Sequence, residues 1–159
     1  MVDHEYWMEQ ALSLADRAES KSEIPVGAIV VLDNEIIGQG YNAPISNVDP
    51  TAHAEIQAIR SACNRVGNYR LPGSRLYVTL EPCSMCAGAI VHARIAQLIY
   101  GAVEPKSGVV CSQHQFFSEG FLNHKVDIVG GVLAEKASEK LSGFFQYRRK
   151  QKKMLKKMD

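Results

Sequence analysis

In the last two thirds of the chain, short apolar runs alternate with segments whose apolar side chains recur at helical spacing. The runs 75–80, 97–101 and 126–129 predict strands, whereas 84–93 and the segment from residue 133 onward predict helices. Strands that alternate with helices in this way need crossover connections. This alternation, more than any other feature, constrains the fold: it predicts an α/β class with a mixed sheet and helices on both faces.

The first third of the chain predicts a helix followed by a β-hairpin. Apolar residues recur at helical spacing over residues 4–20. The continuous apolar run 26–32 is typical of a strand that is buried on both faces. The pair 33–34 supplies a tight turn, and a second strand returns over residues 35–41. Two glycines inside that second strand favour an edge position in the sheet.

A further helix is predicted to begin at Asp49-Pro50. Asp is a favoured N-cap residue, and proline is well tolerated at the first helical position. We expect this helix to run to about Cys63. It would carry His53 near its start.

The composition indicates one domain of ordinary size. The chain has 159 residues, of which 46% are hydrophobic and 22% charged, close to globular averages. No apolar run approaches the ~18 residues of a membrane span, and the first residues lack the features of a signal peptide. We therefore expect a cytoplasmic protein without membrane contact. There, the four cysteines would serve as metal ligands or buried thiols rather than as disulfides.

Basic residues are concentrated at the C-terminal end. Seven of the 18 Lys and Arg residues lie within 148–159, together with one acidic residue. Residues 1–147 keep 11 basic and 16 acidic residues, a formal charge of −5. The pattern indicates a polyanionic partner, although a solvated helix end that binds nothing would look the same. We divide the chain into a domain, 1–150, and a basic tail, 151–159.

Two cysteines, Cys83 and Cys86, stand three positions apart after a predicted strand and at the start of a predicted helix. This spacing lets both sulfurs face one point. The positive end of the helix favours the thiolate, which is the form that binds metals. A redox pair or two buried cysteines would show the same spacing.

His53 is the best candidate for a third ligand, and Glu55 follows it by two residues. A catalytic zinc ion has three protein ligands and an open position for water, whose pKa it lowers to about 7. A nearby carboxylate can take the water proton and return it to a leaving group, and Glu55 is the candidate for that role. Positions i and i+2 lie roughly 200° apart on an ideal helix, so both side chains reach one site only in an irregular first turn.

These residues resemble the zinc-dependent cytidine/deoxycytidylate deaminase superfamily, whose signature is His-x-Glu followed by Pro-Cys-x-x-Cys. Within it, the chain is similar to the bacterial tRNA-specific adenosine deaminases over residues 4–150. The segments that carry this similarity are 23–28, 49–55, 68–71, 76–95, 100–102, 122–126 and 144–149. The resemblance implies a three-layer α/β/α sandwich with a five-stranded mixed sheet, one Zn²⁺ per chain and a homodimer. It also implies hydrolytic deamination of adenosine to inosine at the wobble position of the arginine tRNA with an ACG anticodon.

The resemblance further implies roles for individual residues. The zinc ligands match His53, Cys83 and Cys86, and the proton shuttle matches Glu55. Among positions that contact the flipped nucleoside, Asn42 matches an asparagine and Ala54 a residue whose backbone faces the base. The positions that approach the tRNA anticodon loop are Lys106, Phe145, Arg148 and Arg149. Helical spacing makes Phe144, Phe145 or both core residues. DNA is not expected as a natural substrate.

The chain departs from the family pattern in one loop. Glu104 stands where Asp is usual, and residues 111–114 read Cys-Ser-Gln-His in place of Gly-Ser-Leu-Met. Both departures lie near expected RNA contacts and leave the metal ligands unchanged. They concern the recognition of RNA rather than the chemistry.

Two other functions stay open at this point. One is a deaminase of free nucleobases or nucleosides, cytosine or guanine, that uses the same zinc chemistry. The other is a structural zinc module that binds nucleic acid without catalysis, in which Cys111 closes the site as a fourth ligand. Without such a role, Cys63 and Cys111 are predicted to be small buried residues.

Overall fold

The computed structural model describes residues 2–158. Within this range the helices are α1 (His4–Ser20), α2 (Ala54–Val66), α3 (Ser84–His92) and α4 (Ala134–Lys157). The strands are β1 (Gly27–Leu32), β2 (Glu35–Tyr41), β3 (Arg75–Leu80), β4 (Gln97–Ala102) and β5 (Asp127–Val129). A short 3-10 helix, η1 (Phe116–Ser118), interrupts the long connection between β4 and β5.

The strands form one mixed sheet in the order β2-β1-β3-β4-β5. β1 is antiparallel to both β2 and β3, whereas β3, β4 and β5 run parallel. The parallel half requires crossovers, and α3 supplies the one between β3 and β4. The predicted five-stranded mixed sheet is confirmed, and β2 occupies the edge that its glycines favoured.

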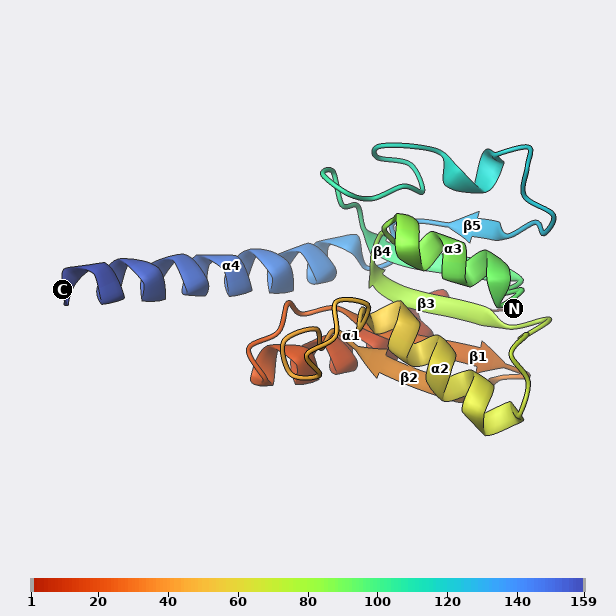
Figure 1. Ribbon diagram of the computed structural model, residues 1–159, viewed down its shortest axis with the longest axis horizontal. Coiled ribbons are helices and arrows are strands. Elements are labelled where there is room, and N and C mark those ends of the chain that lie inside the picture. The colour runs from red at the N-terminus through yellow and green to blue at the C-terminus, as the bar shows by residue number, and fades with distance from the viewer. Residues whose placement is uncertain (1, 159) are drawn as a thin grey trace.

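Helices cover both faces of the sheet, which gives the three layers visible in Figure 1. Successive side chains of a strand point to opposite faces. In β1, Ile29 and Val31 pack with the residues of α1, whereas Ala28 and Val30 pack with those of α2 and α3. α4 contacts β3 and β4. The prediction of a first strand buried on both faces is confirmed, because β1 lies between two apolar layers.

α2 begins at Ala54, later than the sequence predicts. The Asp49 carboxylate accepts hydrogen bonds from the N–H and the hydroxyl of Thr51, both at 2.8 Å, and so closes a local turn instead of capping a helix. The Ala52 carbonyl then accepts the Ala43 N–H at 2.9 Å. The chain therefore enters the helix only at His53, which becomes its N-cap residue.

α2 lies close against the edge strand β2. A Cβ atom on Gly38 would lie 2.4 Å from the Ala58 carbonyl oxygen, and one on Gly40 would lie 2.4 Å from that of Ala54. Real Cβ atoms do not approach backbone so closely, so both positions require glycine. This contact fixes the start of α2 beside the end of β2.

α4 continues well past the edge of the sheet (Figure 1). Ala137 and Phe144 are its buried residues, and every residue from 145 to 158 is exposed. The helix crosses residue 150 without a break and presents the basic residues of the C-terminal end to solvent. Among the described residues, no helix combines the length and apolarity that a membrane span requires.

Candidate metal centre and substrate cavity

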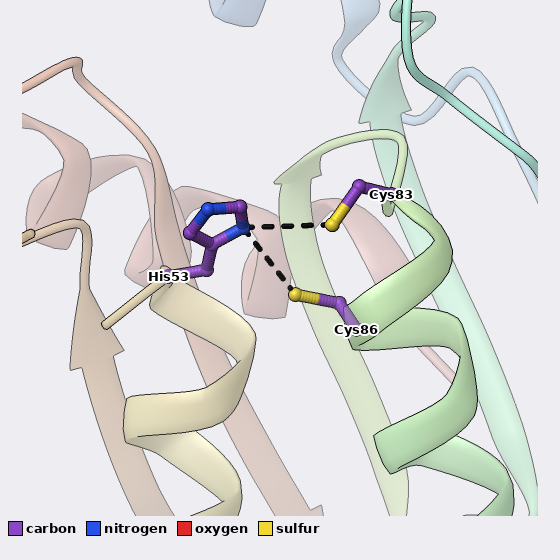
Figure 2. Close-up of side chains that lie close together, drawn as sticks. All are labelled: His53, Cys83 and Cys86. Carbon is purple, nitrogen blue, oxygen red and sulfur yellow. Dashed lines mark hydrogen bonds between the residues drawn. The ribbon is translucent and has the colours of Figure 1, made fainter. Parts of the chain in front are cut away.

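The N-termini of α2 and α3 point to one place, where His53, Cys83 and Cys86 face one another (Figure 2). His53 is the N-cap residue of α2 and Cys83 is the N-cap residue of α3. Both have extended backbone angles, and neither side chain caps its own helix. The imidazole and the thiol are therefore free to turn toward each other, and Cys86 joins them from the first turn of α3.

The distances among these side chains fit a tetrahedral zinc site. His53 Nδ1 lies 3.6 Å from the sulfur of Cys83 and 3.6 Å from that of Cys86. Bonds of about 2.3 Å to sulfur and about 2.0 Å to nitrogen place the two ligand atoms roughly 3.5 Å apart around tetrahedral zinc. All three ligand atoms lie within 4.8 Å of one another. The three residues are positioned to bind one metal ion, with Nδ1 as the ligand atom of His53.

The surroundings of Cys83 favour its thiolate form, which is the form that binds metals. A hydrogen bond from the Cys86 thiol, with help from His53, lowers the pKa of Cys83 to about 4. The same hydrogen bond raises the pKa of Cys86. The pair therefore holds one proton at neutral pH, and metal binding would release it. The positive ends of α2 and α3 favour the resulting negative charge.

Glu55 lies in the first turn of α2, beside the three candidate ligand residues, and its exposed fraction is 5%. Burial raises the pKa of its carboxyl to about 7. His53 stands ahead of the helix with φ −72° and ψ 155°, so the angular separation of positions i and i+2 on a helix does not apply. Both side chains line the same cavity because His53 precedes the helix, and not through the irregular first turn that the sequence predicts.

A cavity of about 370 Å³ opens beside the candidate metal centre. Asn42, His53, Glu55 and Cys83 are among the polar residues that line it. The other lining residues are apolar side chains, loop residues and one face of α4. They are Ile24, Val26 and Leu80; Glu81, Val103, Glu104, Pro105 and Ser107; and Ser138, Leu141, Ser142 and Phe145. Reactive polar groups and a largely apolar lining thus share one cavity, as is common in small-molecule sites.

The structure brings some of the predicted substrate contacts to this cavity. Asn42 is 8% exposed and lines it at the end of β2. Phe145 lines it from α4 and is 40% exposed, whereas its neighbour Phe144 is buried in the core. The expectation that at least one of these two rings packs in the core is confirmed.

The other predicted contacts lie outside the cavity wall. Ala54 is buried as the first residue of α2, and Lys106 is exposed in the loop after β4. Arg148 donates a hydrogen bond to the Ser22 carbonyl at 2.9 Å, and its guanidinium lies 4.9 Å from the centre of the Phe144 ring. Arg149 is exposed on the next position of α4.

Sequence reasoning missed the face of α4 that closes the cavity. Ser138, Leu141 and Ser142 were missed, although they share the i, i+3, i+4, i+7 spacing of one helix face with the predicted Phe145, a signal that could have grouped them. Glu81 was also missed, since nothing in its sequence neighbourhood shows which groups it contacts.

Cys111 does not join the three candidate ligands. Its sulfur lies 3.2 Å from the Tyr100 hydroxyl, and among the described residues the metal-binding group comprises His53, Cys83 and Cys86 alone. Cys111 is exposed and Cys63 is half-buried, so the prediction of two buried cysteines is wrong for Cys111. The backbone N–H of Cys111 donates to the Glu81 carboxylate at 2.9 Å, and its side chain lies at the surface of the loop after β4.

Comparison with known proteins agrees with this geometry. The signature of the cytidine and deoxycytidylate deaminase zinc-binding region matches residues 1–102. The tRNA-specific adenosine deaminase of Haemophilus influenzae is 54% identical over 151 residues, which cover 94% of this chain and 87% of that protein. A structure solved in studies of A-to-I editing by tRNA:A34 deaminases at the wobble position is 47% identical. It superposes with a TM-score of 0.83 and covers 86% of this chain and 99% of its own.

A guanine deaminase from Bacillus subtilis is less similar. It is 33% identical with a TM-score of 0.63, and the match covers 93% of this chain and 95% of that one. The signature covers more than half of the chain, and the match to the Haemophilus protein covers nearly all of it. The chain therefore belongs to the cytidine and deoxycytidylate deaminase family, among its tRNA-specific adenosine deaminases.

Proposed function

We propose that this chain catalyses the zinc-dependent hydrolytic deamination of adenosine to inosine at the wobble position of a tRNA anticodon, with the ACG-anticodon arginine tRNA as substrate. The observation that carries the proposal is the convergence of His53, Cys83 and Cys86 beside the buried Glu55, at the end of a cavity. Two relatives that match more than nine tenths of its length, at 54% and 41% identity, are tRNA-specific adenosine deaminases.

His53 Nδ1 and the sulfurs of Cys83 and Cys86 would hold the zinc ion. When bound, zinc supplies Lewis-acid chemistry that generates a nucleophile from water at neutral pH. Glu55 is the general base and acid: its carboxylate takes one proton of the water and delivers it to the ring nitrogen, and it then carries the second proton, from the added hydroxyl, to the departing amine. Overall, the oxygen of water replaces the exocyclic amine of adenine, and ammonia is released.

The cavity suits a single extruded nucleotide. Its apolar walls, which include Ile24, Val26 and Leu80, can pack against the faces of a base. The Asn42 side chain lines the cavity and offers both a donor and an acceptor to the nucleoside. The unpaired bases of an anticodon loop are already accessible, so extruding one of them costs less than it would in a duplex.

The exposed part of α4 and the loop after β4 are the parts of the chain that we assign to the anticodon loop. Phe145 stands at the cavity with part of its ring in solvent, where a neighbouring base can stack. Arg148, Arg149 and Lys106 are exposed, and exposed cations of this kind bind phosphates. The backbone of Ala54, next to His53, faces the base in this assignment.

Three further expectations remain part of this proposal. The protein acts as a homodimer, it works in the cytoplasm, and residues 1–150 form the deaminase domain ahead of the basic tail, 151–159. What supports all three is the similarity to bacterial tRNA-specific adenosine deaminases. The exposed basic residues of α4 add support for a tail that contacts RNA.

The experiment is a comparison of substrates with the zinc-loaded protein. An ACG-anticodon stem-loop should yield inosine, and a chelator should stop its formation. Free adenosine, guanine and cytosine should react far more slowly. The similarity to a guanine deaminase makes guanine the informative rival substrate, and faster turnover of guanine than of the stem-loop would reject the proposal.

The role of Glu55 needs a separate variant. Glu55→Ala should retain zinc and fold while inosine formation falls by at least about 10²-fold, because general acid–base catalysis contributes that much or more. Circular dichroism and metal analysis provide the control. Normal turnover in a zinc-loaded Glu55→Ala protein would remove Glu55 from the mechanism.

A further inference from the structure

Glu81 is a buried carboxylate that the chemistry above does not use. It follows β3 directly and is 2% exposed. Its two oxygens accept hydrogen bonds from the backbone N–H groups of four loop residues at 2.9–3.0 Å, and these are Glu104, Val110, Cys111 and Ser112. The Ser112 hydroxyl donates a fifth hydrogen bond.

These donors belong to one long loop, residues 103–115, which joins β4 to η1. Three of the N–H groups come from the consecutive residues 110–112 and converge on a single oxygen of Glu81, in the manner of a backbone anion nest. Gly108 completes the enclosure, because a Cβ atom there would lie 2.4 Å from the Glu81 carboxyl carbon. The loop is thus folded around one carboxylate, and its Val110 side chain also packs into the apolar core.

The same loop forms one wall of the substrate cavity. Val103, Glu104, Pro105 and Ser107 line the cavity, and all four precede the run 110–112 that Glu81 holds. Without these hydrogen bonds, a loop of this length that lacks regular structure would sample more conformations, and ordering it would cost conformational entropy. Substrate binding would then have to supply that ordering.

We propose that Glu81 is a positioning residue that holds the loop 103–112 in place as a preformed wall of the nucleotide cavity. Glu81 is itself among the cavity-lining residues, but the loop occupies both of its oxygens, so it acts through the loop rather than on the reacting atoms. A preformed wall favours substrate binding in the ground state and the transition state alike, so its loss raises KM more than it lowers kcat. The inference rests on the proposed function for its substrate and on the hydrogen bonds for its mechanism.

The test uses the full-length, zinc-loaded protein. Glu81→Gln keeps the size of the side chain but sets an amide against backbone donors. Gly108→Ala leaves the carboxylate intact and crowds the loop away from it. Ser112→Ala removes one hydrogen bond only. Glu23→Gln is the matched control, because Glu23 is also 2% exposed and accepts two backbone N–H groups, from Ile45 and Ser46, which do not line the cavity.

Three quantities are measured for each variant: amide hydrogen exchange at residues 104 and 110–112, zinc content, and KM and kcat for the stem-loop. For Glu81→Gln and Gly108→Ala we expect faster exchange, full zinc content, a KM raised by about tenfold or more, and a kcat within about threefold of wild type. Ser112→Ala should show the same changes to a smaller extent. Glu23→Gln should leave KM and loop exchange unchanged.

Either of two results would overturn the inference: unchanged exchange in the loop, or faster exchange with an unchanged KM. A loss of kcat that tracks a loss of zinc, with KM unchanged, would also overturn it and assign Glu81 a purely structural role. If Glu81→Gln does not fold, Gly108→Ala is judged by the same criteria. If the wild type makes no inosine from the stem-loop, the proposed function fails, while hydrogen exchange still reports whether Glu81 holds the loop.

Discussion

His53 and Cys83 stand at positions that Ser, Thr, Asp or Asn usually occupy in helices. A capping side chain at such a position contributes about 1 kcal/mol, and neither residue caps its helix. The two helices therefore lack the stabilisation of a side-chain cap, and an imidazole and a thiol lie at their positive ends instead. A metal that binds the folded chain offsets this loss, since its binding free energy adds to the folding free energy.

Glu23 predicts how stability depends on pH. Burial opposes its ionisation, but hydrogen bonds from Ser46 and Ile45 outweigh that effect and hold the pKa of Glu23 below its usual value. Its folded pKa is therefore lower than its unfolded pKa of about 4.5. The ionised carboxylate stabilises the protein fully above that value, and this stabilisation disappears as the pH falls through the folded pKa.

The measurement is urea unfolding of wild type and Glu23→Gln between about pH 7 and pH 3. The difference in unfolding free energy should be constant at the upper end and should shrink as the pH falls below about 4.5. A difference that does not change with pH would show that the charge of Glu23 contributes nothing.

The metal ligands and Glu55 could be predicted at the residue scale, whereas the roles of the buried acids Glu23 and Glu81 could not. The spacing of Cys83 and Cys86 and the His-x-Glu pair are local patterns with few chemical uses. Glu23 and Glu81 bind backbone N–H groups of residues more than twenty positions away. Backbone donors have no side-chain signature, so only the folded chain shows these contacts.

At the scale of elements, the glycines of β2 determine where α2 lies. The sequence indicated an edge strand from these glycines, and the structure shows their second role as the surface on which α2 rests. The start of α2 was predicted too early because Asp49 has two uses, as a helix cap and as a turn former. Its sequence neighbourhood, with Pro50 next, fits both.

Gly40→Ala tests this contact. The added Cβ atom would lie 2.4 Å from the Ala54 carbonyl, next to His53, so α2 must shift. We expect a loss of about 1–3 kcal/mol in unfolding free energy, as for other overpacked sites, together with weaker zinc binding. Calorimetry and competition with a metal indicator would measure the two effects.

Gly143→Ala is the matched control, because Gly143 is inside α4 and a Cβ atom there meets nothing within 4 Å. This variant should gain about 0.5–1 kcal/mol from helix propensity and bind zinc normally. Equal zinc affinity in Gly40→Ala and wild type would show that the position of α2 does not depend on this contact.

The projecting half of α4 predicts a salt effect on RNA binding. Truncation after Arg149 removes five lysines and keeps the contacts of Arg148 with Ser22 and Phe144. Stem-loop affinity should fall, and the slope of log K against log salt should become shallower by about 0.7 for each phosphate that the shortened helix no longer neutralises. Zinc content should be unchanged. An unaltered slope would mean that this end of the helix is merely solvated.

At the scale of the whole molecule, the fold brings together two halves of the chain. The candidate ligand His53 and the proposed base Glu55 follow the β1–β2 hairpin, whereas the two cysteines follow β3, which pairs with β1 on its other side. The alternation of strands and helices predicted the mixed sheet and its layers. The strand order could not be predicted in the same way, because it depends on pairings between distant segments. The convergence of His53 with the two cysteines was therefore inferred from the chemistry of zinc ligands rather than from the topology of the sheet.

The central claim is that the metal has three protein ligands and one open position beside Glu55. X-ray absorption spectroscopy of the zinc-loaded protein tests it most directly. We expect one nitrogen at about 2.0 Å, two sulfurs at about 2.3 Å and one further oxygen from solvent, with an identical spectrum for Cys111→Ser. A third sulfur that disappears in Cys111→Ser would describe a closed structural site and would contradict the account.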